Sequence, residues 1–301
     1  KTLVLTKMKA ILKENSKVSL QDIPEPKIKE DEVLIRVHTA CCCRTDSFAA
    51  QGKIRTANPL VLGHEFSGTV EEKGYEVRSV IVNERVAVMP IWKDSFGMYS
   101  GVMLGIDRNG GFAEFASVPA ECIHKIPDEL SLKEAAYLEP VTAALAVIQA
   151  DFSKKGKCVI LGENRISDLI YRIMIFYGFQ NITVLSAGSI SAVSENEFDF
   201  GIETEAESEG FSHLIRAVRP RGKIILKSRQ PVPMQISVKN IAEKELVLQG
   251  AGYGSFEEAV KIAGSLKLSE LMLDTAIEKI PEFLLNTDMA GKEKKKICFS
   301  F

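Results

Sequence analysis

Residues 158–162, Cys158-Val159-Ile160-Leu161-Gly162, form a continuous apolar run that ends at a glycine. Such a run is typical of a strand that is buried on both faces of a sheet. The next segment, 166–177, places its apolar residues on one stripe of a helix and is followed by Gly178 where a C-terminal cap is wanted. A second apolar run occupies residues 182–185. The order strand, glycine, helix, strand predicts a βαβ unit and therefore a doubly wound parallel sheet over residues 141–269.

The first 125 residues have a different pattern, in which short runs of strand character are separated by Pro, Gly and charged turns. Residues 132–149 are rich in Ala, Leu and Glu at helical spacing, and we expect Pro140 to interrupt this helix. The predicted strands of the first part are 9–12, 32–38, 68–70, 84–88 and 112–118. The sequence thus predicts a β-rich domain followed by an α/β domain.

Composition excludes some classes of function. The formal net charge of -2 argues against a nucleic-acid-binding protein, which would carry a basic surplus. No stretch approaches eighteen consecutive apolar residues and the start lacks a signal-peptide pattern, so we expect no membrane span and a cytoplasmic protein. The basic run 292–296 is expected to be a solvated terminal turn.

The six cysteines stand at positions 41, 42, 43, 122, 158 and 298. Three consecutive cysteines are a poor arrangement for a disulfide framework. We therefore expect free thiols or metal ligands in a reducing compartment, with Cys41 and Cys42 as packing residues.

Three segments carry residues that bind metals: 41–46, which ends Cys43-Arg44-Thr45-Asp46, 63–65, which contains His64 and Glu65, and 138–140, which contains Glu139. Zinc binds a thiolate, an imidazole and a carboxylate well, and a catalytic zinc keeps a fourth position open. Each residue alone is more often structural than a ligand. Their combination in a β-rich domain before a βαβ unit favours a metal site.

The spacing of 21 residues between Cys43 and His64, with the segment 63–70, resembles the catalytic-zinc signature of the zinc-dependent medium-chain alcohol and polyol dehydrogenases. Segments 111–115, 126–140 and 219–224 are also similar to this family, the second to its sorbitol-dehydrogenase branch. The resemblance implies a GroES-like β-rich catalytic domain, 1–140 with 270–301, and a Rossmann-type nucleotide-binding domain, 141–269. It also implies a homodimer or homotetramer.

The resemblance implies that Cys43 and His64 ligate zinc and that Glu139 is the third ligand. Glu65 would either swing in as a ligand or lie beside the ligands. On this basis Glu139→Ala is expected to weaken zinc retention more than Glu65→Ala does.

Two neighbours of Cys43 acquire roles from the same resemblance. Asp46 would accept the second ring N–H of His64 and so fix its tautomer. Thr45 would bond the substrate alcohol and pass its proton outward. Phe48 stands where relatives often have a histidine, so the outer end of this proton path departs from the family.

The sequence departs from the family at the structural zinc and at the dinucleotide fingerprint. Residues 89–111 contain no cysteine, whereas most zinc members have a four-cysteine lobe there, so we expect one zinc per chain. The turn Gly162-Glu163-Asn164-Arg165-Ile166-Ser167 keeps only the first glycine of Gly-x-Gly-x-x-Gly. About a dozen residues separate Ser186 from the next strand near 198, which predicts a domain trimmed on its adenine side.

The expected cofactor is NAD(H) or NADP(H), bound weakly and with little preference. The second strand ends at 185–188, Leu-Ser-Ala-Gly, without the acid that would bond the ribose. The candidate cofactor-binding residues are Arg44, Gly162, Asn164, Arg165 and Ser186.

Three functions remain open at this point. The first is a zinc- and NAD(P)-dependent dehydrogenase for a secondary alcohol or polyol, which the set Cys43, Thr45, Asp46, His64 and Glu139 favours. The second is a non-redox zinc enzyme, a lyase or isomerase, which the eroded glycine turn favours. The third is a cofactor-less binding protein on the same fold.

Overall fold

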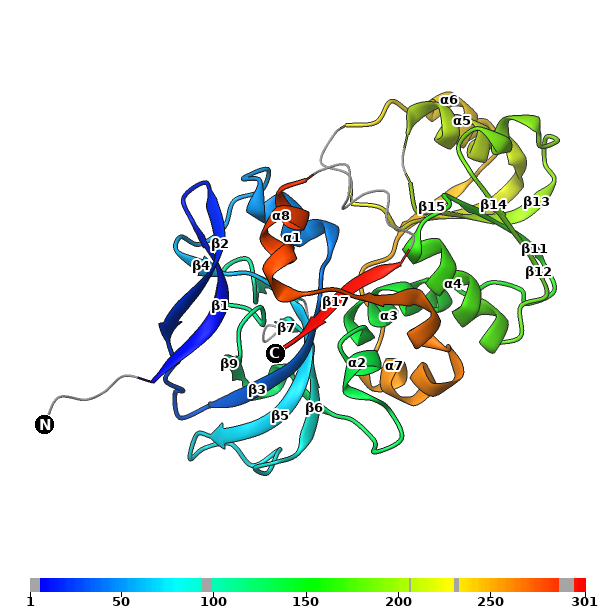
Figure 1. The fold of residues 1–301 in the computed structure, drawn as a ribbon. Helices are drawn as coiled ribbons and strands as arrows, with labels where there is room; N and C mark the ends of the chain where they lie inside the picture. The colour runs from blue at the N-terminus through cyan, green and yellow to red at the C-terminus, as the bar shows by residue number, and fades with distance from the viewer. Residues whose placement is uncertain (1–5, 94–98, 206, 230–232, 287–294) are drawn as a thin grey trace, which may run out of the picture. The chain divides into compact units, whose positions relative to one another are not determined.

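The computed structural model describes residues 6–93, 99–205, 207–229, 233–286 and 295–301. The chain divides into two units, Lys1–Glu139 with Lys267–Phe301, and Pro140–Leu266. The division predicted from the sequence lay after 140 and after 269. Each unit is described by itself below (Figure 1). None of the helices among the described residues is long and apolar enough to cross a bilayer.

The first unit is β-rich, as predicted, and its main sheet has the order β10-β6-β5-β3-β17-β16, with β9 also paired to β3. A smaller sheet has the order β2-β1-β4, and β7 pairs with β8. Strand β1 alternates between buried and exposed residues, which is the period of a half-buried strand. The strands are β1 (Lys7–Glu14), β2 (Lys17–Pro24), β3 (Glu32–Cys41), β4 (Leu60–Val61), β5 (Glu65–Lys73), β6 (Arg85–Val88), β7 (Ile91–Lys93), β8 (Tyr99–Met103), β9 (Phe115–Pro119), β10 (Ile123–Lys125), β16 (Met272–Asp274) and β17 (Lys296–Ser300).

Strand β3 organises this unit because it is buried along almost its whole length and pairs antiparallel with β5, β9 and β17. Its register places Cys41 opposite Glu65 of β5 and opposite Cys298 of β17. The residues that follow β3 are thereby brought to the start of β5 and of the C-terminal strand.

The helices of the first unit are short: α1 (Arg44–Ala50), η1 (Ala120–Cys122), α2 (Leu132–Ala135), η5 (Leu268–Leu271), η6 (Ile277–Lys279) and α8 (Ile280–Leu285). Helix α3 (Leu138–Leu145) crosses into the second unit. The prediction that Pro140 interrupts a helix over 132–149 was wrong in its position. The break lies between α2 and α3, and Pro140 stands in the first turn of α3, where the missing N–H has no helical partner to lose.

Where relatives would carry the four-cysteine lobe, this chain has the antiparallel pair β7–β8, whose connecting residues 94–98 lie outside the described part. Leu104 N then bonds Pro90 O at 3.0 Å, which returns the chain to the body of the unit.

The second unit contains a five-stranded parallel sheet with the order β12-β11-β13-β14-β15 among the described residues. Counted along this unit, the order is 2-1-3-4-5, which is a doubly wound order without the strand that would lie beyond β12. The trimmed Rossmann-type sheet that the sequence predicts is therefore present. Its strands are β11 (Lys157–Leu161), β12 (Asn181–Leu185), β13 (Phe198–Glu203), β14 (Val218–Leu226) and β15 (Val247–Gly250).

Helices link these strands, with α4 on one face of the sheet and α5 and α6 on the other (Figure 1). Helix α4 buries Leu169, Ile170 and Ile173 and ends before Gly178, whose φ of +86° is the left-handed cap conformation. On the opposite face Val159 and Leu161 of β11 pack against residues of α5. The helices are η2 (Ala146–Ala150), α4 (Arg165–Phe176), η3 (Ser189–Ala192), α5 (Ser208–Ala217), α6 (Val238–Glu243), α7 (Phe256–Ile262) and η4 (Ala263–Ser265).

Candidate metal centre

Cys43 lies between the end of β3 and the start of α1, where it is the N-cap residue. Its amide donates to Asp46 Oδ2 at 2.8 Å, and Asp46 Oδ1 lies 2.7 Å from Nδ1 of His64. Asp46 and His64 are almost completely buried. Because the carboxylate engages Nδ1, Nε2 is the ring nitrogen that can bind a metal. This contact of Asp46 with the ring is the one that the family resemblance implies.

His64 and Glu65 lie at the junction of β4 and β5, and Gly63 makes this junction possible. Its φ is +95°, and a Cβ there would lie 2.0 Å from the Phe112 ring. Only glycine can therefore let the chain pass Phe112 and place His64 beside Cys43.

Cys43, His64 and Glu65 each offer one donor atom, and these atoms lie within 4.8 Å of one another. His64 Nε2 is 3.9 Å from Glu65 Oε1. Donor atoms bound to one tetrahedral zinc lie roughly 3–4 Å apart, because the bonds themselves are about 2.0–2.3 Å long. The thiolate, imidazole and carboxylate are the donor set that zinc takes, so these residues fit the ion.

The charges around the sulfur favour the ligand form of Cys43. Burial raises the pKa of the Cys43 thiol, but Lys296 and His64 outweigh it, so that this pKa falls to about 6. The lowered pKa favours the thiolate, which is the form that binds metal. Burial lowers the pKa of His64, but the charge and hydrogen bond of Asp46, together with Cys43, outweigh burial and raise this pKa.

Lys296 is a site residue that sequence reasoning missed. It begins β17, is 2% exposed, and its Nζ lies 2.5 Å from Glu65 and 5.2 Å from the centre of the Tyr137 ring. The prediction that 292–296 is a solvated turn was therefore wrong for Lys296, because the antiparallel pairing of β17 with β3 carries it inside. Residues 292–294 of that prediction lie outside the described part of the chain. The apolar strand residues directly after Lys296 were the signal that could have revealed this.

Both oxygens of Glu65 lie 2.5 Å from Lys296 Nζ, but only Oε1 is placed to accept its hydrogen bond. Oε2 is buried and has no hydrogen-bond partner among the described residues. Burial raises the pKa of Glu65 and so do the charges of Cys43 and Glu139, while Lys296 opposes them. Glu65 thus already faces one cation, Lys296, and its Oε2, which makes no hydrogen bond among the described residues, is the oxygen that a metal would engage.

Glu139, near the start of α3, is buried and lies close enough to raise the pKa of Glu65. It is not one of the three grouped donors. The geometry therefore gathers Glu65 with Cys43 and His64, and it leaves Glu139 beside them.

The remaining predicted residues of the first unit lie around Cys43. Thr45 Oγ1 is 3.8 Å from Cys43 Sγ, and its side chain is half-buried. Arg44 is exposed, with its guanidinium 5.8 Å from the centre of the Phe48 ring.

The expectation of free thiols was wrong for two of the six cysteines. Cys41 and Cys298 form a disulfide between the paired strands β3 and β17. Cys42 is free and buried, as the packing role required, and burial raises its pKa. The sequence did not predict this pairing, because Cys41 and Cys298 lie 257 residues apart and no local pattern relates them.

The other four predicted cofactor residues lie at the carboxyl ends of β11 and β12 in the second unit. Gly162 follows β11 with a φ of +121°, Asn164 is the N-cap of α4, and Arg165 is its first residue. Ser186 follows β12, and its amide bonds Ser189 Oγ at 2.9 Å.

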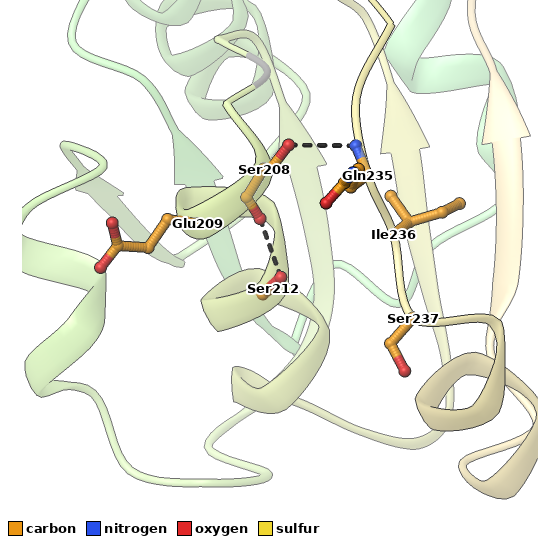
Figure 2. A pocket seen from close by; sticks show the side chains of 6 residues that line it. All are labelled: Ser208, Glu209, Ser212, Gln235, Ile236 and Ser237. Atoms are coloured by element: carbon orange, nitrogen blue, oxygen red, sulfur yellow. Dashed lines mark hydrogen bonds between the residues drawn. The ribbon is translucent and has the colours of Figure 1, made fainter.

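A shallow hollow of the second unit lies between the start of α5 and the chain that leads to α6 (Figure 2). The amide of Gln235 donates to Ser208 Oγ at 3.0 Å, and Ser212 Oγ donates to Ser208 O at 2.8 Å. None of the residues that line this hollow is a predicted site residue. The lining consists of Ser208, Glu209, Ser212, Gln235, Ile236 and Ser237.

Residues 29–128 match the model of the alcohol dehydrogenase GroES-like domain. The chain is 25% identical over 317 aligned positions to D-xylulose reductase of Saccharomyces cerevisiae, covering 88% of this chain and 89% of the relative. It is 31% identical over 211 positions to L-threonine 3-dehydrogenase of Bacillus velezensis, covering 64% and 58%.

Solved structures show the same fold. A zinc-binding dehydrogenase of Sinorhizobium meliloti bound to NADP superposes with a TM-score of 0.90 at 20% identity, over 98% of this chain and 100% of that one. The 2R,3R-butanediol dehydrogenase of Bacillus subtilis gives a TM-score of 0.86 at 23% identity, over 98% and 99%.

Proposed function

We propose, since this chain belongs to the zinc-type medium-chain alcohol and polyol dehydrogenase family, that Cys43, His64 and Glu65 bind one catalytic zinc and that the substrate is a secondary alcohol or polyol. Transfer of hydride between an alcohol and NAD(P) is the reaction of the family, and it is the reaction of this enzyme. The observation that carries the proposal is the convergence of these three donors on one buried point.

The residues divide the chemistry among them. Zinc, when bound, acts as a Lewis acid that stabilises the deprotonated alcohol near neutral pH. Asp46 holds the His64 ring by its Nδ1, and Thr45 accepts the proton of the substrate hydroxyl. As it accepts this proton, Thr45 gives up its own hydroxyl proton to solvent water, which its half-buried place beside Cys43 leaves within reach. Phe48, where relatives often have a histidine, supplies no further acceptor, so the protein part of this path ends at Thr45.

Metal analysis of the purified full chain, joined to assays on secondary alcohols and polyols with NAD⁺ and NADP⁺, tests this proposal. We expect about one zinc per chain, because residues 89–111 contain no cysteine. Cys43→Ser should lose both zinc and turnover. Thr45→Val should keep zinc and lose turnover by roughly 10²–10⁴-fold, the scale of a positioned proton acceptor.

Cys122→Ala is the matched control, since Cys122 is a free, buried thiol of the same unit outside the donor cluster. It should retain zinc and turnover. Two tightly held zinc ions per chain, or full zinc retention by Cys43→Ser, would contradict the proposed ligands.

The assembly is also a proposal: a homodimer, or a homotetramer built from such dimers. Strand β15 lies at the edge of the parallel sheet, and Val247 on it is half exposed. An edge strand offers unpaired backbone groups to a second copy.

A cytoplasmic location is a further proposal. Four of the six cysteines are free thiols, which suits a reducing compartment, whereas the Cys41–Cys298 disulfide is more typical of an oxidising one. Fractionation of the source cells with an antibody against the chain tests it, and recovery outside the cytoplasm would refute it.

A further inference from the structure

The start of α4 is the place where a Rossmann-type sheet receives phosphate. Ligands bind beyond the carboxyl ends of the strands at the point where the strand order reverses, which here lies between β11 and β13. The free amides of a helix N-terminus then point at the phosphate. Whether this chain can use them depends on what its own side chains do at 162–167.

Asn164 already occupies those amides. Its Oδ1 accepts hydrogen bonds from Ile166 N at 3.0 Å and from Ser167 N at 3.1 Å. In return Ser167 Oγ accepts from Asn164 N at 3.2 Å. The side chain therefore serves two of the donors that a phosphate would need.

The space above the turn is filled as well. Asn164 Nδ2 donates to Thr204 Oγ1 at 3.0 Å, and Thr204 Oγ1 donates to Leu161 O at 2.8 Å. A Cβ built on Gly162 would lie 2.3 Å from Thr204 Oγ1 and 2.9 Å from Asn164 Nδ2. Ser167 Oγ donates to Gly162 O at 2.5 Å, so the polar groups of the turn satisfy one another.

The polar groups of the turn after β12, where a ribose would bind, also bond one another. Ser186 and Ser189 bond each other through their hydroxyls at 2.9 Å, and Ser189 N donates to Ser186 Oγ at 3.2 Å. The carboxyl end of β12 thus supplies a small self-bonded turn where an acid would bind the ribose.

We propose that the phosphate turn of this chain is capped from within by Asn164 and Thr204, and that a dinucleotide must displace Asn164 to place its pyrophosphate on α4. The residues as they stand do not fit the phosphate, because it would only replace hydrogen bonds that the turn already makes. This proposal rests on the proposed function only in taking NAD(H) or NADP(H) as the ligand. It identifies Asn164 as the residue that holds dinucleotide affinity down.

Titration of NADH and NADPH fluorescence with the zinc-loaded full chain tests this directly, without any assay of turnover. Asn164→Gly should bind both dinucleotides at least about tenfold more tightly than wild type, since freed amides can make charge-assisted hydrogen bonds to phosphate. Asn164→Ser keeps a capping oxygen and should stay near the wild-type affinity. Glycine costs little at an N-cap, so the variant should fold.

Asn196→Gly is the matched control, because Asn196 is exposed in the same unit but precedes β13, at the amino end of the strands. It should leave both affinities unchanged. If Asn164→Gly is poorly folded, Asn164→Asp takes its place: it keeps the cap and adds a negative charge, so binding should weaken severalfold.

Unchanged affinity in Asn164→Gly, or in Asn164→Asp where that is used, would overturn the proposal. Submicromolar binding by the wild type would overturn it too. Failure of the proposed function is recognised separately, because it appears as missing zinc or turnover in chains whose dinucleotide affinities still follow this order.

Discussion

At the scale of single residues, the buried pair of Glu65 and Lys296 sets the electrostatics of the metal centre. Two opposite charges in a buried site cost much desolvation, and removing one of them leaves the other unpaired. The same lysine lowers the pKa of Cys43, so it favours the thiolate while it competes with a metal for Glu65. A substitution of Glu65 or of Glu139 that is meant to test zinc binding therefore has to account for Lys296.

The two carboxylates can be ranked by zinc retention against a competing chelator. The geometry leads us to expect that Glu65→Gln combined with Lys296→Met weakens retention at least about tenfold, because it removes a grouped donor without leaving a lone buried cation. Glu139→Gln should weaken it less.

Lys296→Met alone serves as the control for the double variant and should retain zinc, since Glu65 remains. If Glu139→Gln loses zinc strongly while the double variant retains it, Glu139 is the ligand, as the family resemblance implies.

At the scale of elements, one glutamate ties the start of β3 to its neighbours. Glu32 is 3% exposed, accepts from Ser117 Oγ of β9 at 2.7 Å and forms an ion pair with Arg108. Burial raises the pKa of Glu32, but these hydrogen bonds outweigh it and the net direction is downward. Because β3 ends at the metal centre, this anchor also supports the site.

We expect Glu32→Gln to lower the free energy of unfolding of the first unit by about 1–3 kcal/mol at neutral pH, the cost of weakening hydrogen bonds to a buried charged group. A folded-state pKa below the unfolded value gives stability that is present above the ordinary value of 4.5 and is lost as the pH falls through the folded value. The difference between wild type and variant should therefore shrink in acid.

Urea unfolding followed by the fluorescence of Trp92, the single tryptophan, measures this in the first unit. Glu71→Gln is the control, because the Arg36–Glu71 pair of the same sheet is well exposed and should contribute about 0–1 kcal/mol. A loss that is equal for both variants, or that does not change with pH, would contradict the role given to Glu32.

At the scale of the whole molecule, the chain leaves the β-rich unit after 139 and returns to it at 267. The return pairs β17 with β3 (Figure 1). Strand β17 carries Lys296 and Cys298. The parallel sheet of the second unit ends in β15, which the proposed assembly uses.

Sedimentation velocity over a range of concentrations tests the proposed dimer. Val247→Asp puts a charge on the edge strand and should shift the chain toward monomer. Val238→Asp is the control, because Val238 is more exposed, in α6 of the same unit, and should change nothing. A wild-type chain that stays monomeric, or a Val247→Asp variant that assembles as wild type does, would rule out this interface.

Much of the fold could be predicted from local pattern. The period of the apolar residues indicated the strands and α4, and the short interval between 186 and 198 predicted the missing strand. The break in the helix was predicted at Pro140 because the sequence alone did not show that a new helix begins at Leu138, two residues before this proline. Local preferences determine that a helix exists better than they determine where it begins.

The sequence by itself determined the donor types at Cys43, His64 and Glu65, the eroded glycine turn and the two-part fold. Only the tertiary structure decided that Lys296 and Glu65, 231 residues apart, share one buried site, and that Cys41 bonds Cys298. It also brought Asn164 and Thr204, 40 residues apart, into hydrogen-bond contact at the turn that follows β11. The physical reason is that these contacts depend on strand register and on the path of the chain between distant segments, which no local periodicity encodes.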